Sequence, residues 1–188
     1  MVADTTAINR RNHTLADDAL VWLFGYGSLI FKADFPYLER RPARIEGWAR
    51  RFWQGSHDHR GTPQAPGRVA TLIEAPGAIC QGIAYRLTGA TFAQLDYREK
   101  NGYLRLATTL HLDRDGEAVQ GLIYLATPNN PAFLGPAPAA VIARQIAAAQ
   151  GPSGTKLDYL LDLDAALRAL GTRDPHVDEL IAELPRRR

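Results

Sequence analysis

Cysteine is almost absent from this sequence of 188 residues: Cys80 is the only one, so no intrachain disulfide bond can form. Cys80 lies in an apolar, strand-like run with no activating base nearby in the sequence, which favours a place in the core. Long apolar runs are also missing, because no stretch approaches the roughly 18 residues that a membrane-spanning helix needs. Residues 1–18 are polar and include acidic side chains, unlike a secretory signal. We therefore expect a cytoplasmic protein with no membrane partner.

The sequence has little excess charge of either sign. Its formal net charge is +2, which is unlike a chain that coats nucleic acid or an anionic membrane. Apolar residues make up 46% of the chain, which is enough for one compact domain with a core. We expect a monomer with no nucleic-acid partner, made of a flexible leader at residues 1–19 and a single domain at residues 20–188.

The pattern of apolar residues predicts mainly antiparallel strands followed by helices, which is an α+β architecture. A run of Val, Trp, Leu and Phe at residues 21–24 predicts a buried central strand. Residues 68–74 and 79–87 are predicted to pair as a hairpin, and a second hairpin is predicted at the Asp-Gly turn of residues 113–117. Thr91 and Asp174 are the expected N-caps of two helices. The other predicted elements are strands at 43–56 (with a kink at Gly47), 103–112 and 118–125, and helices at 91–101, 139–150, 156–170 and 175–184.

The predicted strand at residues 21–24 ends in a glycine-flanked turn, Gly25-Tyr26-Gly27-Ser28. Two glycines allow backbone conformations that other residues rarely adopt. A strand that ends in such a turn exposes a row of backbone N–H groups, which can bind an anion without a charged side chain. We therefore predict that this turn holds the α-amino-acid end of a substrate.

A carboxylate lies on the apolar face of the helix predicted at residues 91–101. Phe92, Leu95 and Glu99 share one face, while Asp96 and Lys100 are expected to pair at its flank. A buried carboxylate is costly unless it is partnered or protonated, and burial raises its pKa toward the range useful for proton transfer. The helix alone equally allows Glu99 to turn into solvent at the helix end and pair with an arginine.

Other candidate sites have a plainer explanation each. His57 and His59 could bind a metal, but no third ligand is evident and an exposed turn is the favoured interpretation, so no metal is expected. Gly151-Pro152-Ser153-Gly154 could bind an anion before a helix, or it could be an ordinary interhelical turn. Arg50-Arg51-Phe52-Trp53 mixes basic and aromatic residues as nucleic-acid surfaces do, but a strand with alternating faces explains it. Ser28 lacks the surroundings of a hydrolase nucleophile.

Taken together and in this order, the motifs resemble the ChaC family of γ-glutamylcyclotransferases, in its glutathione-specific branch. Each motif alone is weak, but the ordered series runs from about Val21 to the last predicted helix. The matching segments are Phe24-Gly25-Tyr26-Gly27-Ser28-Leu29-Ile30, Arg50-Arg51-Phe52-Trp53-Gln54-Gly55-Ser56, Asp58-His59-Arg60-Gly61, Pro66-Gly67-Arg68-Val69, Ala84-Tyr85-Arg86-Leu87, Leu95-Asp96-Tyr97-Arg98-Glu99-Lys100, Gly102-Tyr103, Leu134-Gly135-Pro136 and Gly151-Pro152-Ser153-Gly154.

The resemblance implies a small mixed, mainly antiparallel β-barrel flanked by helices. It implies cleavage of glutathione to 5-oxoproline and cysteinylglycine, with neither water nor a cofactor. The family's glycine turn, which holds the γ-glutamyl group, matches Tyr26, Gly27, Ser28 and Leu29, and its catalytic glutamate matches Glu99. Tyr103 and Tyr159 are expected to line the pocket. The sequence departs from the family pattern after Gly154 and at Asn101, which bears on the part of the pocket around the cysteinylglycine half.

Two other functions remain open at this point. The same cyclisation could act on other γ-glutamyl amides or dipeptides. Alternatively, the fold could serve as a binding module without catalysis, although a pure binder has no need of a costly carboxylate at Glu99. Nucleic-acid binding is disfavoured by the nearly balanced charge.

Overall fold

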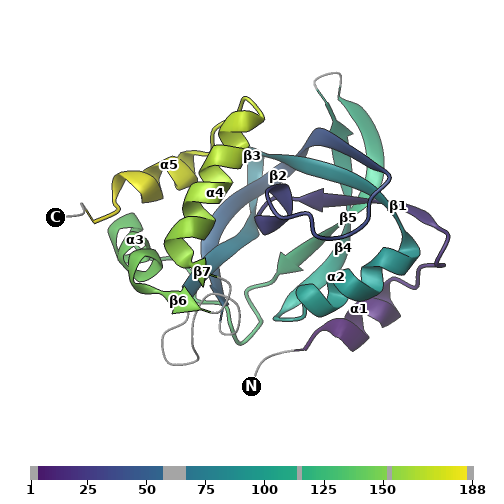
Figure 1. The fold of residues 1–188 in the computed structure, drawn as a ribbon, viewed down its shortest axis with the longest axis horizontal. Coiled ribbons are helices and arrows are strands. Elements are labelled where there is room, and N and C mark those ends of the chain that lie inside the picture. Colours follow the sequence, from purple (N-terminus) through teal and green to yellow (C-terminus); the bar gives the residue numbers. More distant parts are fainter. Residues whose placement is uncertain (1–3, 57–66, 114–115, 152–153, 186–188) are drawn as a thin grey trace.

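The computed structural model describes residues 4–56, 67–113, 116–151 and 154–185. Within these residues, five strands close into a barrel in the order β1-β3-β2-β4-β5 (Figure 1). Neighbouring strands run antiparallel except β1 and β5, whose parallel pairing closes the barrel. The barrel is therefore mixed and mainly antiparallel, as predicted. The strands are β1 (Leu20–Gly25), β2 (Glu39–Ser56), β3 (Gly67–Thr88), β4 (Tyr103–Leu112) and β5 (Glu117–Ala126).

The predicted hairpin of residues 68–74 and 79–87 is wrong, because both stretches belong to the single long strand β3. Strand β3 pairs antiparallel with β2 along its length, and the register shifts between Glu46 and Trp48. Gly47, at φ +79°, occupies the shift, so the predicted kink there is confirmed. A bulge of this kind bends a strand without reversing it, which lets two long strands curve around a barrel.

Helices cover two sides of the barrel. Figure 1 shows α3 (Ala139–Ala148), α4 (Lys156–Ala169) and α5 (Pro175–Ala182) together on one side, where they pack on each other. On the other side lie α1 (Thr6–Asn12) and α2 (Phe92–Arg98), next to each other. The remaining elements are the 3-10 segments η1 (Ser28–Ile30) and η2 (Gly89–Thr91) and the short pair β6 (Gln150–Gly151) and β7 (Gly154–Thr155).

The two predicted helix caps differ in outcome. The carboxylate of Asp174 accepts from the backbone N–H groups of His176 and Val177 at 3.0 and 3.2 Å, and Pro175 is the first helical residue, as predicted. Thr91 makes no side-chain capping bond, because the helical path begins earlier, at η2. Helix α2 also ends at Arg98, before the predicted residue 101.

Helix α1 lies within the stretch that the sequence predicts as a leader. The sequence predicts a flexible leader there, whereas α1 rests on α2 and β4. Its residue Asn9 is fully buried. The helix is therefore part of the packed structure.

Arg50-Arg51-Phe52-Trp53 lies in β2, and its faces alternate as predicted: Arg50 and Phe52 are buried, while Arg51 and Trp53 are half-buried. Cys80 is buried in the core, also as predicted, and burial raises the pKa of its thiol. The alternation of β2 therefore carries one arginine inward, where it needs polar partners.

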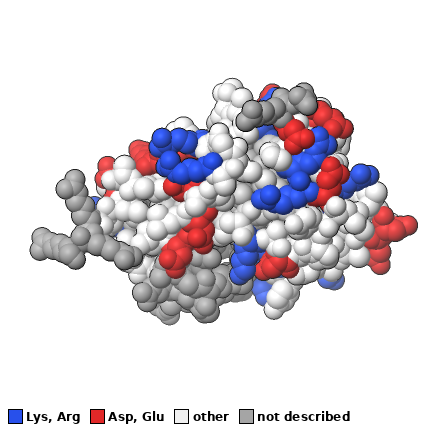
Figure 2. Space-filling model, turned by 45° about the horizontal axis from the view of Figure 1, so that its top comes forward, with Lys and Arg blue, Asp and Glu red and all other residues white. Residues whose placement is uncertain are grey.

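The charges on the surface are interspersed. Figure 2 shows positive and negative side chains next to each other over the visible face. Arg41, for example, forms ion pairs with Asp113 and Glu117, and Arg44 with Glu46. None of the helices in the described ranges is both long and apolar enough to cross a membrane.

Candidate active site

The glycine turn follows directly from β1 and leads into η1. A Cβ atom added at Gly25 would lie 2.7 Å from the Cβ of Leu29, and one added at Gly27 would lie 2.7 Å from the Oη of Tyr159. Neither glycine has a positive φ, and Gly27 has a φ of −124° and a ψ of −128°, which lies outside the usual helical and strand regions. Both positions require glycine because neighbouring atoms leave no room for a side chain.

Two buried donors hold this turn in place. Arg50, which is 1% exposed, donates from Nε to the carbonyl oxygen of Tyr26 at 2.7 Å, and its Nη1 lies 2.6 Å from the Oδ2 of Asp174. The hydroxyl of Tyr85 donates to the carbonyl oxygen of Leu29 at 2.7 Å. Sequence reasoning missed these roles, because the only signal was an arginine on the inward face of a strand.

A cavity of about 200 Å³ opens between the turn, the end of α2 and the barrel wall. A smaller pocket of about 40 Å³ lies beside it, against the turn itself. Four residues line both spaces: Ser28, Glu99, Tyr103 and Tyr159. Tyr26, Gly27 and Leu29 line the smaller pocket. The structure thus brings together all seven residues that the sequence nominates for the site.

Glu99 follows the last residue of α2 and points toward both spaces. Its side chain is 16% exposed, and its Oε1 lies 3.2 Å from the Nε of Arg98. Burial raises the pKa of Glu99; the Arg98 guanidinium lowers that pKa, and the carboxylate of Asp34 raises it further. Glu99 therefore pairs with an arginine, as one interpretation of the sequence allowed, but it does so inside the cavity and not in solvent.

Arg98 ties the two halves of the site together. Besides Glu99, its guanidinium donates to the Oγ of Ser28 at 3.1 Å, to the carbonyl oxygen of Lys32 at 2.9 Å and to the carboxylate of Asp34. One side chain thus connects the end of α2 to the glycine turn. The sequence names Arg98 only as part of a motif and does not reveal this connection.

Two tyrosines of the site, Tyr26 and Tyr103, act as donors to carbonyl groups. The hydroxyl of Tyr26 donates to the carbonyl oxygen of Tyr124 at 2.6 Å, and that of Tyr103 to Ala70 at 2.8 Å. Burial raises the pKa of both phenols well above the ordinary value, so both keep their protons at neutral pH. Both phenols therefore act as hydrogen-bond donors and not as bases.

The predicted pair of Asp96 and Lys100 is wrong. Asp96 is 1% exposed and accepts a hydrogen bond from the hydroxyl of Tyr124 at 2.7 Å, while the Nε of Arg105 lies 3.2 Å away. Lys100 instead places its Nζ 4.0 Å from the ring centroid of Tyr97. A buried carboxylate needs strong partners, and the core supplies a guanidinium and a phenol.

Two of the weaker sequence candidates lie wholly or partly outside the described residues. This applies to His57 and His59, and to residues 152 and 153 of the Gly-Pro-Ser-Gly motif. Within the described ranges, no group of three or more His, Cys, Asp or Glu side chains is placed to hold a metal ion.

Comparison with known proteins gives consistent matches over most of the chain. A family model described as ChaC-like protein matches residues 21–187. Gamma-glutamylcyclotransferase 2-3 of Arabidopsis thaliana is 44% identical over 173 residues, covering 85% of this chain and 86% of that protein. Glutathione-specific gamma-glutamylcyclotransferase 1 of Rattus norvegicus is 40% identical over 174 residues, covering 88% of this chain and 78% of that protein.

The fold is similar to a solved structure as well. The crystal structure of the γ-glutamylcyclotransferase specific to glutathione from yeast matches with a TM-score of 0.80 at 30% identity. The match covers 90% of this chain and 99% of the yeast chain.

Proposed function

Because this chain belongs to the family of ChaC-like proteins, we propose that it is a glutathione-specific γ-glutamylcyclotransferase in which Glu99 moves the proton. The observation that carries the assignment of Glu99 is its position: this buried carboxylate lines both the cavity and the smaller pocket beside the glycine turn. The group that moves the proton in this ring closure has to reach both the attacking and the departing nitrogen atom of the substrate. A carboxylate that lines both the cavity and the smaller pocket is placed to do so.

The reaction needs few protein groups because the substrate carries both reactants. The α-amine of the γ-glutamyl residue attacks the carbon of its own γ-carbonyl, and a new C–N bond closes the ring of 5-oxoproline. The bond from that carbon to the cysteinyl nitrogen breaks, which releases cysteinylglycine. The attacking nitrogen loses a proton and the departing nitrogen gains one. The atoms balance without water, and no oxidation occurs, so the enzyme is a lyase that needs no cofactor.

In this proposal Glu99 accepts the proton from the attacking nitrogen and donates it to the departing nitrogen. The amine attacks in its neutral form, and as the C–N bond forms the carboxylate accepts the one proton that the attacking nitrogen loses, and then passes it to the departing nitrogen. A carboxyl group with the ordinary pKa of glutamate gives up a proton easily but accepts one poorly. The raised pKa of Glu99, caused by burial, makes acceptance easier.

The glycine turn holds the γ-glutamyl end in a folded, reactive geometry. In this proposal the backbone N–H groups of the turn from Tyr26 to Leu29 bind the α-carboxylate in the smaller pocket. Tyr103 and Tyr159 form the opposite wall, and the larger cavity receives the cysteinylglycine half. Such pre-arranged geometry can contribute roughly 7–11 kcal/mol to lowering a barrier. The fixed turn is therefore as important as the carboxylate.

We further propose that the enzyme works in the cytoplasm as a monomer and without a nucleic-acid partner. The nearly balanced net charge of +2 supports the last point, and the single reduced cysteine fits a compartment where glutathione keeps thiols reduced. Light scattering on the purified protein tests the monomer: a dimer mass at micromolar concentration would contradict it.

The activity is tested by incubating the purified protein separately with glutathione, γ-glutamylalanine and a γ-glutamylamine, and by quantifying 5-oxoproline by mass spectrometry. Release from glutathione alone is the expected result. Equal release from another donor would instead support a cyclotransferase of broader specificity. No release from any of the three would support a binding module.

The role of Glu99 is tested by Glu99→Gln, which keeps the size of the side chain but cannot exchange a proton. We expect kcat to fall by about 10²–10⁴-fold, which is the usual contribution of general acid–base catalysis. Glutathione should still bind, as measured by calorimetry. The matched control is Glu74→Gln, because Glu74 is an exposed glutamate on β3, and it should leave kcat unchanged. Full activity of Glu99→Gln would disprove the assignment.

A further inference from the structure

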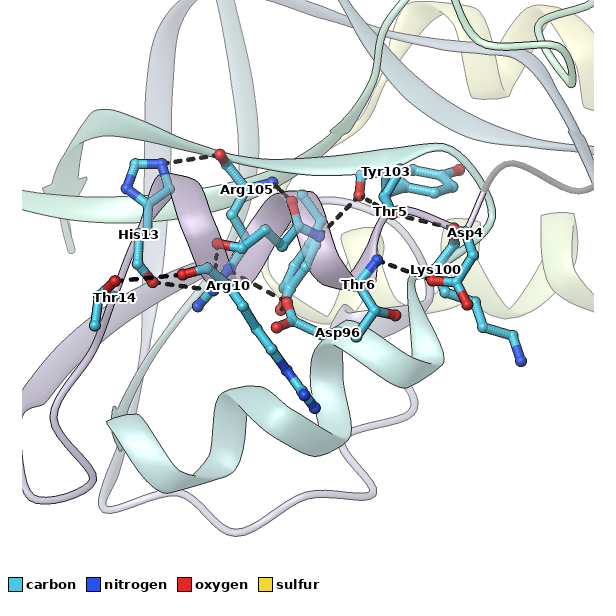
Figure 3. A network of polar contacts seen from close by, with 12 residues as sticks. Asp4, Thr5, Thr6, Arg10, His13, Thr14, Asp96, Lys100, Tyr103 and Arg105 are labelled. Carbon is cyan, nitrogen blue, oxygen red and sulfur yellow. Dashed lines mark hydrogen bonds and ion pairs between the residues drawn. The ribbon is translucent and has the colours of Figure 1, made fainter.

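Helix α1 contacts the stretch of chain that directly follows Glu99. Its fully buried residue Asn9 uses both ends of its amide: Nδ2 donates to the carbonyl oxygen of Tyr103 at 3.1 Å, and Oδ1 accepts from the backbone N–H of Arg105 at 2.8 Å. A side chain that satisfies two backbone groups in this way fixes the start of β4. Figure 3 labels Tyr103 and Arg105, the two residues of β4 whose backbone groups are held. Tyr103, whose carbonyl oxygen is held, also lines the cavity.

The residue before α1 holds the same stretch at a second point. The backbone N–H of Thr5 donates to the carbonyl oxygen of Lys100 at 3.0 Å, and its hydroxyl lies 2.7 Å from the carbonyl oxygen of Tyr103. Asp4 and Asn101 form an isolated antiparallel β-bridge beside these bonds. The contacts of the N-terminal segment therefore enclose the turn between Glu99 and Tyr103 from its outer side.

A buried polar network extends from α1 to the glycine turn. The Nη2 of Arg105 donates to the carbonyl oxygen of Asn9 at 2.7 Å, and its Nε lies 3.2 Å from the Oδ1 of Asp96. Asp96 accepts from the hydroxyl of Tyr124, whose own carbonyl oxygen accepts from the hydroxyl of Tyr26. The helix thus connects to the glycine turn through a chain of buried polar contacts.

Glu99 lies one residue beyond the end of α2, where the chain leaves the helix. The bond from the helix to Glu99 runs from the backbone N–H of Glu99 to the carbonyl oxygen of Leu95, at 2.9 Å. Beyond Glu99 the chain reverses at Gly102, whose φ is +85°. The family model begins at residue 21, so α1 and Thr5 lie outside the region by which the chain is recognised.

From these contacts we infer that the N-terminal segment is a positioning element of the active site: Thr5 and Asn9 hold the backbone from Lys100 to Arg105, and thereby aim Glu99 and Tyr103 at the substrate. The inference rests on the proposed role of Glu99. Neither Thr5 nor Asn9 lines the cavity, so neither touches the substrate.

The test uses a pair of substitutions at Thr5. Thr5→Val has nearly the same shape but lacks the hydroxyl, whereas Thr5→Ser keeps it. A misplacement of about 1 Å can cost about a hundredfold in rate. Thr5→Val removes the hydroxyl that lies 3.0 Å from the carbonyl oxygen of Lys100 and 2.7 Å from that of Tyr103, but keeps the backbone bond, so we expect kcat per folded molecule to fall about tenfold. The KM for glutathione should change less than about twofold, because the binding surface is intact. Thr5→Ser should recover most of the wild-type kcat.

Asn9→Ala provides a second, stronger perturbation, and Arg11→Ala, at an exposed position of the same helix, is the matched control. Circular dichroism gives the folded fraction of every variant, so loss of protein is separated from loss of rate. Wild-type kcat in both Thr5→Val and Asn9→Ala would overturn the inference. A fall of kcat in Arg11→Ala equal to that in Asn9→Ala would overturn it as well.

Amide hydrogen exchange makes the result independent of turnover. We expect the amides of residues 99–105 to exchange faster in Thr5→Val than in the wild type, while the amides of α4 do not change. Unchanged exchange at residues 99–105 would refute the inference even if the wild type released no 5-oxoproline. The absence of turnover in the wild type would refute the proposed function and not the positioning contacts.

Discussion

The closest contact of the glycine turn gives the sharpest test of how the site is built. A methyl group at Gly27 would lie 2.7 Å from the hydroxyl oxygen of Tyr159, but 4.0 Å from the ring carbon that carries this hydroxyl. Gly27→Ala therefore collides with one atom, and Tyr159→Phe removes that atom. The double variant Gly27→Ala/Tyr159→Phe should be free of the collision.

The ring of Tyr159 has little freedom to move away. Its side chain is 5% exposed, and its ring centroid lies 5.6 and 5.8 Å from those of Phe31 and Phe52, both in edge-to-face contact. Overpacking of this kind costs about 1–3 kcal/mol. In a domain of this size, each kcal/mol lowers Tm by about 2–4 °C.

Thermal and urea denaturation of the wild type, both single variants and the double variant complete a mutant cycle. We expect Gly27→Ala to lose stability by about 1–3 kcal/mol and the double variant to regain most of that loss, with a coupling energy above about 1 kcal/mol. If the stability changes of the two single variants add up to that of the double variant within about 0.5 kcal/mol, the reasoning is refuted, because independent sites behave in that way.

Three further predictions concern charge and protonation. Burial raises the pKa of Glu99 above its ordinary value of 4.5, so folding favours the protonated form of this group. Its contribution to stability is present below pH 4.5 and is lost as the pH rises through the raised pKa. Glu99→Gln should therefore gain stability relative to the wild type as the pH rises above 4.5, and a difference in urea denaturation that does not change with pH would contradict this. Burial lowers the pKa of His176 from 6.5 to about 4, and its Nε2 accepts from the backbone N–H of Phe52 at 3.2 Å. The folded protein therefore loses about 3 kcal/mol as the pH falls from 6.5 to 4 while the unfolded chain takes up the proton, and His176→Gln should reduce that slope in urea titrations. An unchanged slope would show that other groups cause it. Arg98→Lys should lower kcat about tenfold, because one ammonium group cannot hold Ser28 and Glu99 in place of a guanidinium fork, and a wild-type kcat in the 5-oxoproline assay would argue against this role.

Features that depend on neighbours in the sequence were predictable. The apolar run before the glycine turn, the capping of α5 by Asp174 and the position of Glu99 on the face shared with Leu95 all follow from local spacing. A special role for the glycine at residue 27 was also predicted from its freedom of backbone conformation, whereas the limited space beside Tyr159 was not.

Features that depend on distant partners were not predictable. Arg50 and Asp174 form an ion pair although they lie 124 positions apart in the sequence. The residues next to either one contain no signal that predicts this pairing. Asp96 has a lysine four residues away at helical spacing, but burial selects Arg105 and Tyr124. The strand β3 was divided in two because residues 75–78 have the composition of a turn, whereas the length of its partner β2 keeps it continuous.

The division of the chain into a leader and a single domain at residues 20–188 stays a prediction. The contacts of Thr5 and Asn9 give the N-terminal segment a place in the packed structure. The amide hydrogen exchange experiment that tests the positioning of Glu99 also tests whether the domain begins at residue 20 or includes these contacts.

The parallel pairing of β1 with β5 determines when the site can form during synthesis. Tyr26, just after β1, bonds to Tyr124 in β5, 98 positions later, and the pairing of Trp22 with Gly121 closes the barrel. A chain growing on the ribosome therefore carries an unpaired, apolar β1 until β5 has emerged, and Tyr159 follows later still. Such a nascent chain exposes apolar surface that chaperones recognise. A partial translation product that ends before β5 therefore lacks the pairing that closes the barrel, and it also lacks Tyr159.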